Sequence, residues 1–315
     1  MTNPMIIKPP VADLPKPAPA TVTAINQVKA GFVAGSKPVS KRVAPRTLAD
    51  PADRALKMMM YGPTGTGKTR IIADFLRAGL KVLAVNVDFG GEGFSTPELE
   101  LRREGKLDLL TNCTAFDLST YDEVEDFIFN TTKFYPEVWD TDWDVIFMDG
   151  FSGFQSTLLD EKVLSMSAGP NAGQARDAGL WADQQAWGQI KRGTTRTLDR
   201  FLRMKNERTG RVPHKFVTCH ENSKPKLDNL TGETRIGPLL QGAGASLIEP
   251  SFDLIGRTRR KRVDENGKKV LKYMYEFSSA DGKALTKTRG FILPETAEAN
   301  FLPIWQMICE QRGIK

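Results

Sequence analysis

Residues 62–69 read Gly62-Pro63-Thr64-Gly65-Thr66-Gly67-Lys68-Thr69 and satisfy every fixed position of the phosphate-binding pattern G-x-x-x-x-G-K-[ST]. In this pattern the glycines let backbone N–H groups surround phosphate oxygens, while the lysine, here Lys68, reaches the β- and γ-phosphates. The hydroxyl of Thr69 is placed to bind Mg²⁺. The stretch therefore predicts a nucleotide site with ATP and Mg²⁺ as ligands, and it contains no motif that separates ATP from GTP.

The residues on either side fit a phosphate loop that joins a strand to a helix. Residues 55–61, A-L-K-M-M-M-Y, suit a buried strand, although their three methionines suit a helix equally well. Residues 69–78 have helical apolar spacing and precede Gly79, a typical helix stop. The dipole of such a helix attracts the same phosphates. A glycine-rich turn without a ligand is the plainer alternative, and the order of strand, loop and helix disfavours it.

Later segments continue the alternation of strands and helices. Residues 81–87 and a stretch near 109–113 are predicted strands, and the capping box T-Y-D-E at 120–123 starts a helix. A long helix is predicted over 181–205, and a further strand over 215–220. Strands that alternate with helices favour an α/β fold with a mainly parallel central sheet flanked by helices.

A second acidic motif follows the phosphate loop after about eighty residues, where 144–149 read D-V-I-F-M-D. The layout is that of a Walker B strand, in which four apolar residues end at a carboxylate, here Asp149. A carboxylate at the end of a neighbouring parallel strand holds the Mg²⁺ that Thr69 also contacts. Taken alone, the segment is equally a buried strand with a capping aspartate. Together with the phosphate loop it predicts Thr69 and Asp149 as metal ligands.

Composition changes at both ends of the chain. Residues 1–52 hold nine of the 19 prolines and are predicted to form a disordered or loosely docked arm, either a plain linker or a tether for a partner or DNA. Residues 53–315 are predicted to form one α/β domain. Within it, the turn signal Asn266-Gly267 predicts β-hairpins over 253–290, and 300–312 is predicted to be a closing helix.

The composition of the whole chain excludes several classes of protein. The 315 residues, 40% of them hydrophobic, suffice for a real core, and no apolar run is long enough to span a membrane. No secretory signal pattern opens the chain, so we expect a cytoplasmic protein. Three widely separated cysteines, Cys113, Cys219 and Cys309, favour neither disulfides nor a zinc site and are predicted to be reduced core thiols.

The motifs together resemble the RecA-like ATPase core and, more closely, the phage-encoded, core-only RecA-like proteins of the single-strand-annealing recombinase group. The resemblance rests on GPTGTGKT at 62–69, VIFMD at 145–149, the strand end at 218–220 and the segment 238–253, and it covers roughly residues 53–305. It implies a Mg²⁺-dependent, DNA-stimulated ATPase that acts on single-stranded DNA in recombination, annealing or replication. It also implies a homo-oligomer, either ring or filament, a single-strand DNA-binding protein as accessory partner, and the host cytoplasm as location.

The resemblance assigns roles to further residues. By the resemblance, His220 is expected to sense the γ-phosphate. From the residues alone, a histidine at this position is equally well explained as the polar residue that ends an ordinary strand. A carboxylate after the second strand is expected to position the attacking water. Asp88 and Glu92 compete for this role, and we favour Glu92 because the neighbouring glycines let it swing toward the phosphate.

The hairpin region carries a concentration of positive charge. Between Arg257 and Arg289, eleven Lys or Arg stand against four acids, a local net charge of +7. By the resemblance, cations of this segment complete the active site of a neighbouring subunit or contact DNA; the candidates are Arg257, Arg259, Arg260 and Arg262. A solvated basic hairpin is the plainer alternative. Tyr273, Tyr275 and Phe277 alternate on one strand, where packing against the core is favoured over stacking on DNA bases.

Other classes of P-loop protein fit the sequence less well. AAA+ enzymes use a glutamate after the Walker B aspartate as their base, whereas Gly150 follows Asp149 here. A small-molecule kinase needs an arginine-bearing lid, for which Arg208 and Arg211 are the available candidates. A nucleotide-gated binding protein with little turnover differs from the ATPase only in rate.

Overall fold

The computed structural model describes residues 54–88, 93–166, 184–222, 226–227, 234–240, 249–279 and 283–314, with the backbone alone for 159–166, 184–187, 189 and 226–227. The predicted arm over 1–52 and the candidate Glu92 lie outside the described residues. Among the described helices, none combines the length and apolar character that crossing a membrane requires.

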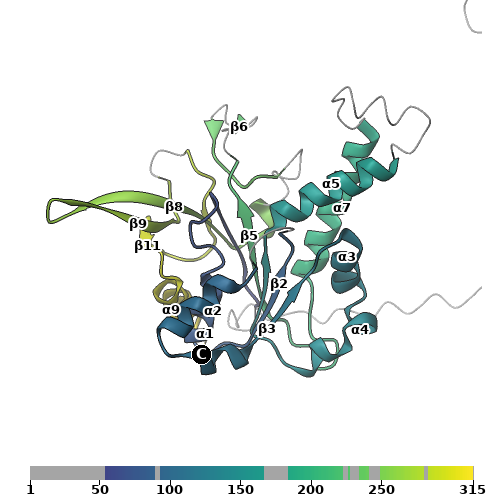
Figure 1. The fold of residues 1–315 in the computed structure, drawn as a ribbon, viewed down its shortest axis with the longest axis horizontal. Helices are drawn as coiled ribbons and strands as arrows, with labels where there is room; N and C mark the ends of the chain where they lie inside the picture. The colour runs from purple at the N-terminus through teal and green to yellow at the C-terminus, as the bar shows by residue number, and fades with distance from the viewer. Residues whose placement is uncertain are drawn as a thin grey trace, which may run out of the picture. The chain divides into compact units, whose positions relative to one another are not determined.

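A parallel sheet forms the centre of the domain (Figure 1). Its parallel strands are β1 (Lys57–Gly62), β2 (Val82–Asn86), β3 (Cys113–Asp117), β4 (Val145–Asp149), β5 (His214–His220) and the first part of β8 (Leu254–Glu265). The order across the sheet is β11-β9-β8-β1-β5-β4-β2-β3. The predicted α/β class with a mainly parallel central sheet is therefore confirmed.

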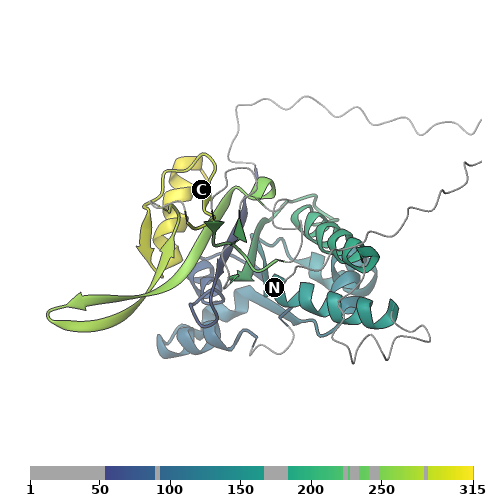
Figure 2. The ribbon, with the colours of Figure 1, turned by 90° about the horizontal axis from the view of Figure 1, so that it is seen from above.

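Antiparallel strands extend the sheet at one edge. They are β9 (Lys268–Glu276), which forms a hairpin with β8, β11 (Thr296–Glu298) beside β9, and β10 (Lys287–Thr288) beside β8. In the hairpin Glu265 pairs with Lys268, and the turn residues Asn266 and Gly267 both have positive φ, 55° and 78°. This confirms the predicted two-residue turn. The hairpin projects well beyond the rest of the sheet (Figure 2). A separate two-stranded ribbon consists of β6 (Lys226–Leu227) and β7 (Thr234–Arg235).

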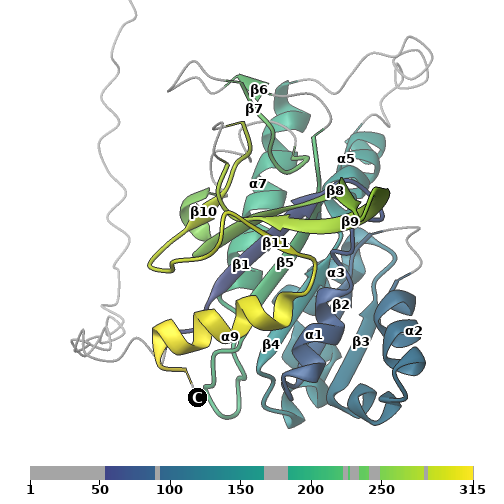
Figure 3. The ribbon, with the colours of Figure 1, turned by 90° about the vertical axis from the view of Figure 1, so that its left-hand side faces the viewer.

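Helices cover both faces of the sheet (Figure 3). One face carries α1 (Ile71–Arg77), α2 (Ser95–Arg103) and α9 (Phe301–Arg312), and the other carries α3 (Tyr121–Phe129), α5 (Phe151–Met166) and α7 (Gln184–Leu202). The connecting segments include η1 (Leu107–Asn112), α4 (Thr131–Phe134) and η2 (Pro136–Asp140). The capping box predicted at 120–123 opens α3 with both of its hydrogen bonds, and the predicted closing helix is α9.

Burial on both faces explains why β1 reads as a continuous apolar run rather than as an alternating one. Met59 and Tyr61 pack with α5 and α7, while Met58 and Met60 pack with α1 and α9. Phe75 of α1 makes edge-to-face contacts with Phe216, Phe301 and Trp305, each with ring centroids 5.5 Å apart. The three methionines at 58–60, whose sequence suited a helix or a strand equally, therefore belong to a strand. The reason is that helices on both faces of the sheet bury them.

Four details differ from the sequence predictions. Residues 109–112 are a 3₁₀ turn, and the third strand begins only at Cys113. The helix α5 was not predicted. Cys219 is buried, but Cys113 and Cys309 are only partly buried. The Walker B strand β4 does not neighbour β1, because β5 lies between them. This last difference brings Thr218 of β5 between the two motifs.

A buried lysine provides a test of the core. The side chain of Lys215 on β5 is 1% exposed and donates a 2.6 Å hydrogen bond to the carbonyl of Pro213. Burial, with a smaller effect of Lys57, lowers its pKa to about 7. Between pH 7 and the usual lysine pKa, the unfolded chain therefore binds a proton that the folded chain does not, and stability rises with pH across this window. Below pH 7 the cost of charging Lys215 is fully present.

We expect Lys215→Met to raise the free energy of unfolding by about 1–4 kcal/mol at pH 6 to 7. The gain should shrink as the pH rises toward 10, because the lysine of the unfolded chain then also loses its proton and folding no longer requires deprotonation. Denaturant titrations at several pH values measure this, with Lys133→Met, at an exposed lysine of α4, as the matched control. A gain of the same size at all pH values would show that the packing of methionine, and not the buried charge, is responsible.

Candidate nucleotide site

The phosphate loop has the backbone conformation that its glycines allow. Gly65 and Gly67 have φ values of 69° and 86°, a region that other residues rarely adopt. The ammonium of Lys68 donates to the carbonyls of Gly62 and Pro63 at 3.0 and 2.9 Å. Burial lowers the pKa of Lys68, and the nearby carboxylate of Asp149 opposes this shift. A phosphate at the loop would add further negative charge beside this partly desolvated cation.

The two predicted metal ligands meet. The hydroxyl of Thr69 donates a 2.6 Å hydrogen bond to Oδ2 of Asp149, and the hydroxyl of Thr218 donates to Oδ1 of the same carboxylate. The N–H of Gly150 in turn donates to Thr218 Oγ1 at 2.9 Å. Burial raises the pKa of Asp149, and the bonds from Thr218 and Thr69 act against that shift. Thr218 therefore orients Asp149. The sequence identified residues 218–220 only as the end of a strand and did not indicate this role.

The chemistry of these donors fits Mg²⁺. A hydroxyl and a carboxylate oxygen are hard ligands, and Mg²⁺ is usually held by one or two protein oxygens, with water and substrate phosphates completing its shell. Among the described residues there is no group of three or more His, Cys, Asp or Glu that would form a complete protein cage for a metal. Thr69 and Asp149 would thus hold the ion together with the phosphates of a nucleotide.

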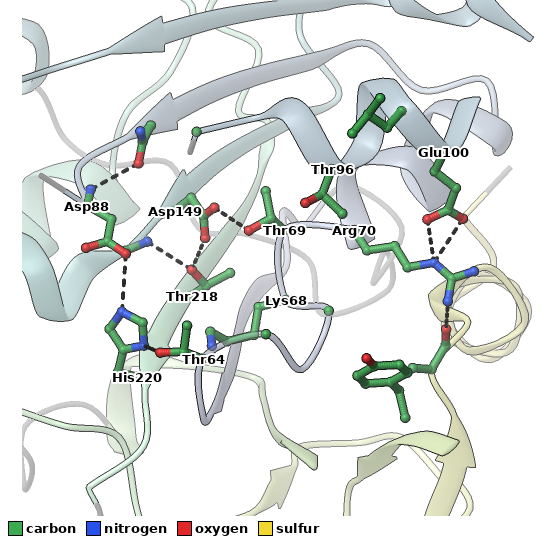
Figure 4. Close-up of a pocket in the computed structure, with 18 of the residues that line it drawn as sticks. Thr64, Lys68, Thr69, Arg70, Asp88, Thr96, Glu100, Asp149, Thr218 and His220 are labelled. Carbon is green, nitrogen blue, oxygen red and sulfur yellow. Dashed lines mark hydrogen bonds and ion pairs between the residues drawn. The ribbon is translucent and has the colours of Figure 1, made fainter. Parts of the chain in front are cut away.

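A second polar group lies beside the metal ligands at the ends of β2 and β5 (Figure 4). The ring of His220 contacts Asp88 Oδ2 through Nε2 at 3.2 Å and Thr64 Oγ1 through Nδ1 at 3.5 Å. The backbone N–H of His220 donates to Ser152 Oγ at 2.9 Å. His220 therefore connects the phosphate loop to the carboxylate of Asp88, the arrangement expected of a group that faces the terminal phosphate.

The contact between Asp88 and Gly150 explains why no glutamate follows Asp149. Gly150 has a φ of 83°, and a Cβ built there would lie 2.2 Å from the Cβ of Asp88. A Cβ at Gly153 would lie 2.5 Å from Asp88 Oδ1. The space beside the Walker B aspartate is thus occupied by Asp88, which reaches it from the neighbouring strand β2.

The basic hairpin begins directly against the phosphate loop, because β8 pairs with β1 in parallel. Thr258 lies 2.6 Å from the hydroxyl of Thr66, and a Cβ at Gly62 would lie 2.1 Å from Thr258 Oγ1. Farther along β8, Arg260 donates to the carbonyl of Gly65 through Nη2 at 2.7 Å and through Nε at 3.3 Å. The sequence predicted the hairpin, but it gave no signal for these contacts.

The other cationic candidates are placed differently. Arg257 is 17% exposed and pairs with Glu221 at 2.7 Å and with Glu276 at 3.5 Å. Arg259 lies 3.7 Å from Glu276. Arg262 is exposed farther along the hairpin. Within this chain Arg257 and Arg259 therefore form ion pairs with carboxylates. Arg260 contacts the phosphate loop, and Arg262 faces solvent.

The arginines proposed for a kinase lid are not at this site. Arg211 pairs with Asp144 at 2.5 Å, and Arg208 pairs with Asp140. Asp144 precedes β4, whereas Asp149 ends it. Arg211 therefore lies at the opposite edge of the sheet from the phosphate loop, and so does its neighbour Arg208. The structure does not bring these two residues into a phosphate-transfer site.

A cleft of about 920 Å³ joins these groups. Its lining contains Lys68, Thr69, Asp88, Asp149 and His220, which were all singled out from the sequence. It continues past Arg70 to Leu99 of α2, which the sequence did not indicate, and to Tyr273 of β9, which the sequence placed in an aromatic stripe. Of the three aromatic residues in the predicted stripe, Tyr275 and Phe277 are buried in the core as favoured, whereas Tyr273 is exposed.

A family model described as an AAA domain matches residues 54–289, which include the phosphate loop, the Walker B strand and the hairpin. A search of curated proteins found no match for the chain. The match is to an AAA domain, and it does not test the expectation, drawn from Gly150, that AAA+ enzymes fit the sequence less well than RecA-like proteins. It covers most of the sheet strands and the ligands of the predicted nucleotide site. The chain therefore belongs to the AAA domain family and is a P-loop ATPase of that type.

Proposed function

We propose that this protein hydrolyses ATP with Mg²⁺ and couples hydrolysis to binding of single-stranded DNA, as a RecA-like protein of phage-type recombination, annealing or replication. The observation that carries the ATPase part is the convergence of Lys68, Thr69 and Asp149 with the Asp88–His220 pair in one cleft. The observation that supports the DNA part is the contact of the basic hairpin with the phosphate loop.

Each group has a distinct part in the proposed mechanism. The loop amides and Lys68 hold the β- and γ-phosphates, and Thr69 and Asp149 hold Mg²⁺, which would neutralise the charge on the phosphate oxygens. Thr218 keeps the Asp149 carboxylate turned toward Thr69. A carboxylate orients the attacking water, and the choice between Asp88 and Glu92 stays a prediction. Asp88 contacts His220, which in turn contacts Thr64 of the phosphate loop, and this geometry favours Asp88 as the carboxylate that orients water.

Two contacts give a physical route from nucleotide to DNA. His220 is followed by Glu221, whose carboxylate holds Arg257 at the start of the hairpin. Independently, Thr258 and Arg260 touch the phosphate loop itself. We propose that a change at the γ-phosphate moves the hairpin through these contacts. We further propose a homo-oligomer, ring or filament, that acts with a single-strand DNA-binding protein in the cytoplasm.

The proposed DNA surface is the outer part of the hairpin, where Lys261, Arg262 and Lys269 are exposed. Replacing these three residues together by Ala should weaken binding of oligo(dT) and reduce the slope of log affinity against log salt by about 2, because each phosphate contact on a single strand contributes about 0.7. Fluorescence anisotropy between low and moderate salt measures both quantities.

This variant avoids Arg260 because its contact with Gly65 would mix DNA binding with nucleotide binding. A matched control replaces three exposed cations elsewhere, Lys133, Arg203 and Arg208, and should leave the slope unchanged. An unchanged slope in the hairpin variant would contradict the proposed surface. Wild-type protein that hydrolyses ATP at the same rate with and without single-stranded DNA, and binds none, would refute the DNA function altogether.

A further inference from the structure

The nucleotide cleft has a second end whose residues have no part in the chemistry described so far. Figure 4 shows Asp88, Asp149, Thr218 and His220 on one side of Lys68, and Arg70, Thr96 and Glu100 on the other. The first side holds the metal ligand Asp149 and the candidate base Asp88, and it is therefore the side that would receive the γ-phosphate. A nucleoside attached to the α-phosphate must extend toward the other side, where α2 and β9 wall the cleft.

Two large apolar side chains are exposed at this second end. Tyr273 of β9 is 41% exposed, and Leu99 of α2 is 49% exposed. The neighbouring aromatic residues of the same strand face, Tyr275 and Phe277, are both buried in the core. Because both side chains line the same cleft, an exposed aromatic ring and an exposed aliphatic side chain are available there to cover the flat apolar face of a nucleobase.

The position of Tyr273 relative to the phosphates is fixed from two directions. Its backbone carbonyl accepts a 2.9 Å bond from the N–H of Ala299, whose own carbonyl accepts a 2.7 Å bond from Arg70, the residue after Thr69. Its ring lies 5.6 Å from the guanidinium of Arg260, and that guanidinium donates to the carbonyl of Gly65 in the phosphate loop. Tyr273 is thus linked through Arg260 to Gly65 within the loop, and through Ala299 to Arg70 directly after it.

We propose that Tyr273 and Leu99 form the nucleobase subsite of the cleft, with the base stacked on the Tyr273 ring and Arg260 as a positioning residue that braces the ring against the phosphate loop. The inference rests on the proposed nucleotide-binding function and deepens it. If the inference holds, the part of the basic hairpin that contains Arg260 and Tyr273 belongs to the nucleotide site. Because stacking strengthens with the size of the ring system, the subsite should favour purine over pyrimidine triphosphates.

The test separates binding of the base from binding of the phosphates. Affinities of the full chain for ATP and for inorganic tripolyphosphate are measured with Mg²⁺ by calorimetry, in wild type, Tyr273→Ala and Tyr273→Phe. We expect Tyr273→Ala to bind ATP about tenfold more weakly, a typical loss for one stacked base, and tripolyphosphate within about twofold of wild type. Tyr273→Phe, which keeps the ring, should bind both ligands as wild type does.

Phe134→Ala is the matched control, because Phe134 is 47% exposed on α4 and does not line the cleft. Arg260→Ala should weaken ATP binding less than Tyr273→Ala does, and the combination of the two should cost less than the product of their separate effects, as expected of a residue that acts through the ring. The preference of wild type for ATP and GTP over CTP and UTP should shrink in Tyr273→Ala.

Three results would overturn the inference. Equal losses of ATP and tripolyphosphate affinity in Tyr273→Ala would mean that the ring supports the phosphate loop and does not contact the base. Unchanged ATP affinity would place the base elsewhere, as would an equal loss in Tyr273→Phe and Tyr273→Ala, which would assign the effect to the hydroxyl. Wild-type protein that binds neither ATP nor tripolyphosphate would refute the proposed function itself, which is a distinguishable outcome.

Discussion

Lys68→Ala is expected to lower ATP affinity and turnover by at least about a hundredfold, because a preorganised donor to developing phosphate charge is worth about 10²–10³ in rate. Lys68 is the cation of the loop, and its ammonium lies among loop carbonyls beside Asp149. Its removal also relieves the cost of burying a charge, so the melting temperature should not fall by more than a few degrees. Calorimetric titration with Mg²⁺-ATP and a coupled phosphate-release assay measure the two losses.

The control for this experiment is Lys133→Ala, at an exposed lysine of α4 that is remote from the cleft. It should bind and hydrolyse ATP as wild type does. A folded Lys68→Ala variant with wild-type affinity and turnover would show that residues 62–69 are not the nucleotide site. Loss of activity accompanied by loss of the folded state would be recognised from the melting curve, and Lys68→Met would then replace it as a longer, uncharged side chain.

Asp149→Asn is expected to reduce turnover by about 10²–10³ while ATP affinity changes by less than about fivefold. The amide has the shape of the carboxylate and can still contact Thr69 and Thr218, but it lacks the charge that a Mg²⁺ ligand supplies. The phosphates stay bound through Lys68 and the loop amides. Turnover should be restored in part by Mn²⁺, which accepts neutral ligands more readily than Mg²⁺ does.

Measurement of kcat and of nucleotide affinity across a Mg²⁺ titration distinguishes the possibilities. Equal losses of binding and turnover, or no loss of either, would argue against a role in organising the metal. Thr218→Val serves as the comparison, since it removes the hydroxyl that orients Asp149 and keeps the shape of the side chain. It should show the same pattern as Asp149→Asn with a smaller loss.

Asp88→Asn and Glu92→Gln complete this series by assigning the carboxylate that orients water. Only the variant of the true base should lose turnover with binding retained. If Glu92→Gln is the inactive one, the contacts of Asp88 with His220 and Gly150 have a structural purpose, and the preference for Glu92 drawn from the sequence is correct. If Asp88→Asn is inactive, the geometry at the end of β2 is the better guide.

Local sequence patterns were sufficient for the parts of this protein that depend on neighbouring residues. The phosphate loop is a continuous backbone conformation, and its glycines, lysine and threonine are fixed by adjacent positions. The strand ending at Asp149, the capping box of α3, the two-residue turn of the hairpin and the helix α9 are likewise encoded within a few residues. Each was recognised because its physical cause is short-range.

The tertiary structure decided which distant segments share an edge of the sheet. Insertion of β5 between β1 and β4 gives Thr218 its hold on Asp149, and the parallel pairing of β8 with β1 brings Thr258 and Arg260 to the phosphate loop. Strand order depends on how long connections cross the sheet and on how both faces are covered, and no local propensity records it. The sequence by itself therefore determined that this protein has a nucleotide-phosphate site, and only the pairing of distant strands decided what surrounds that site.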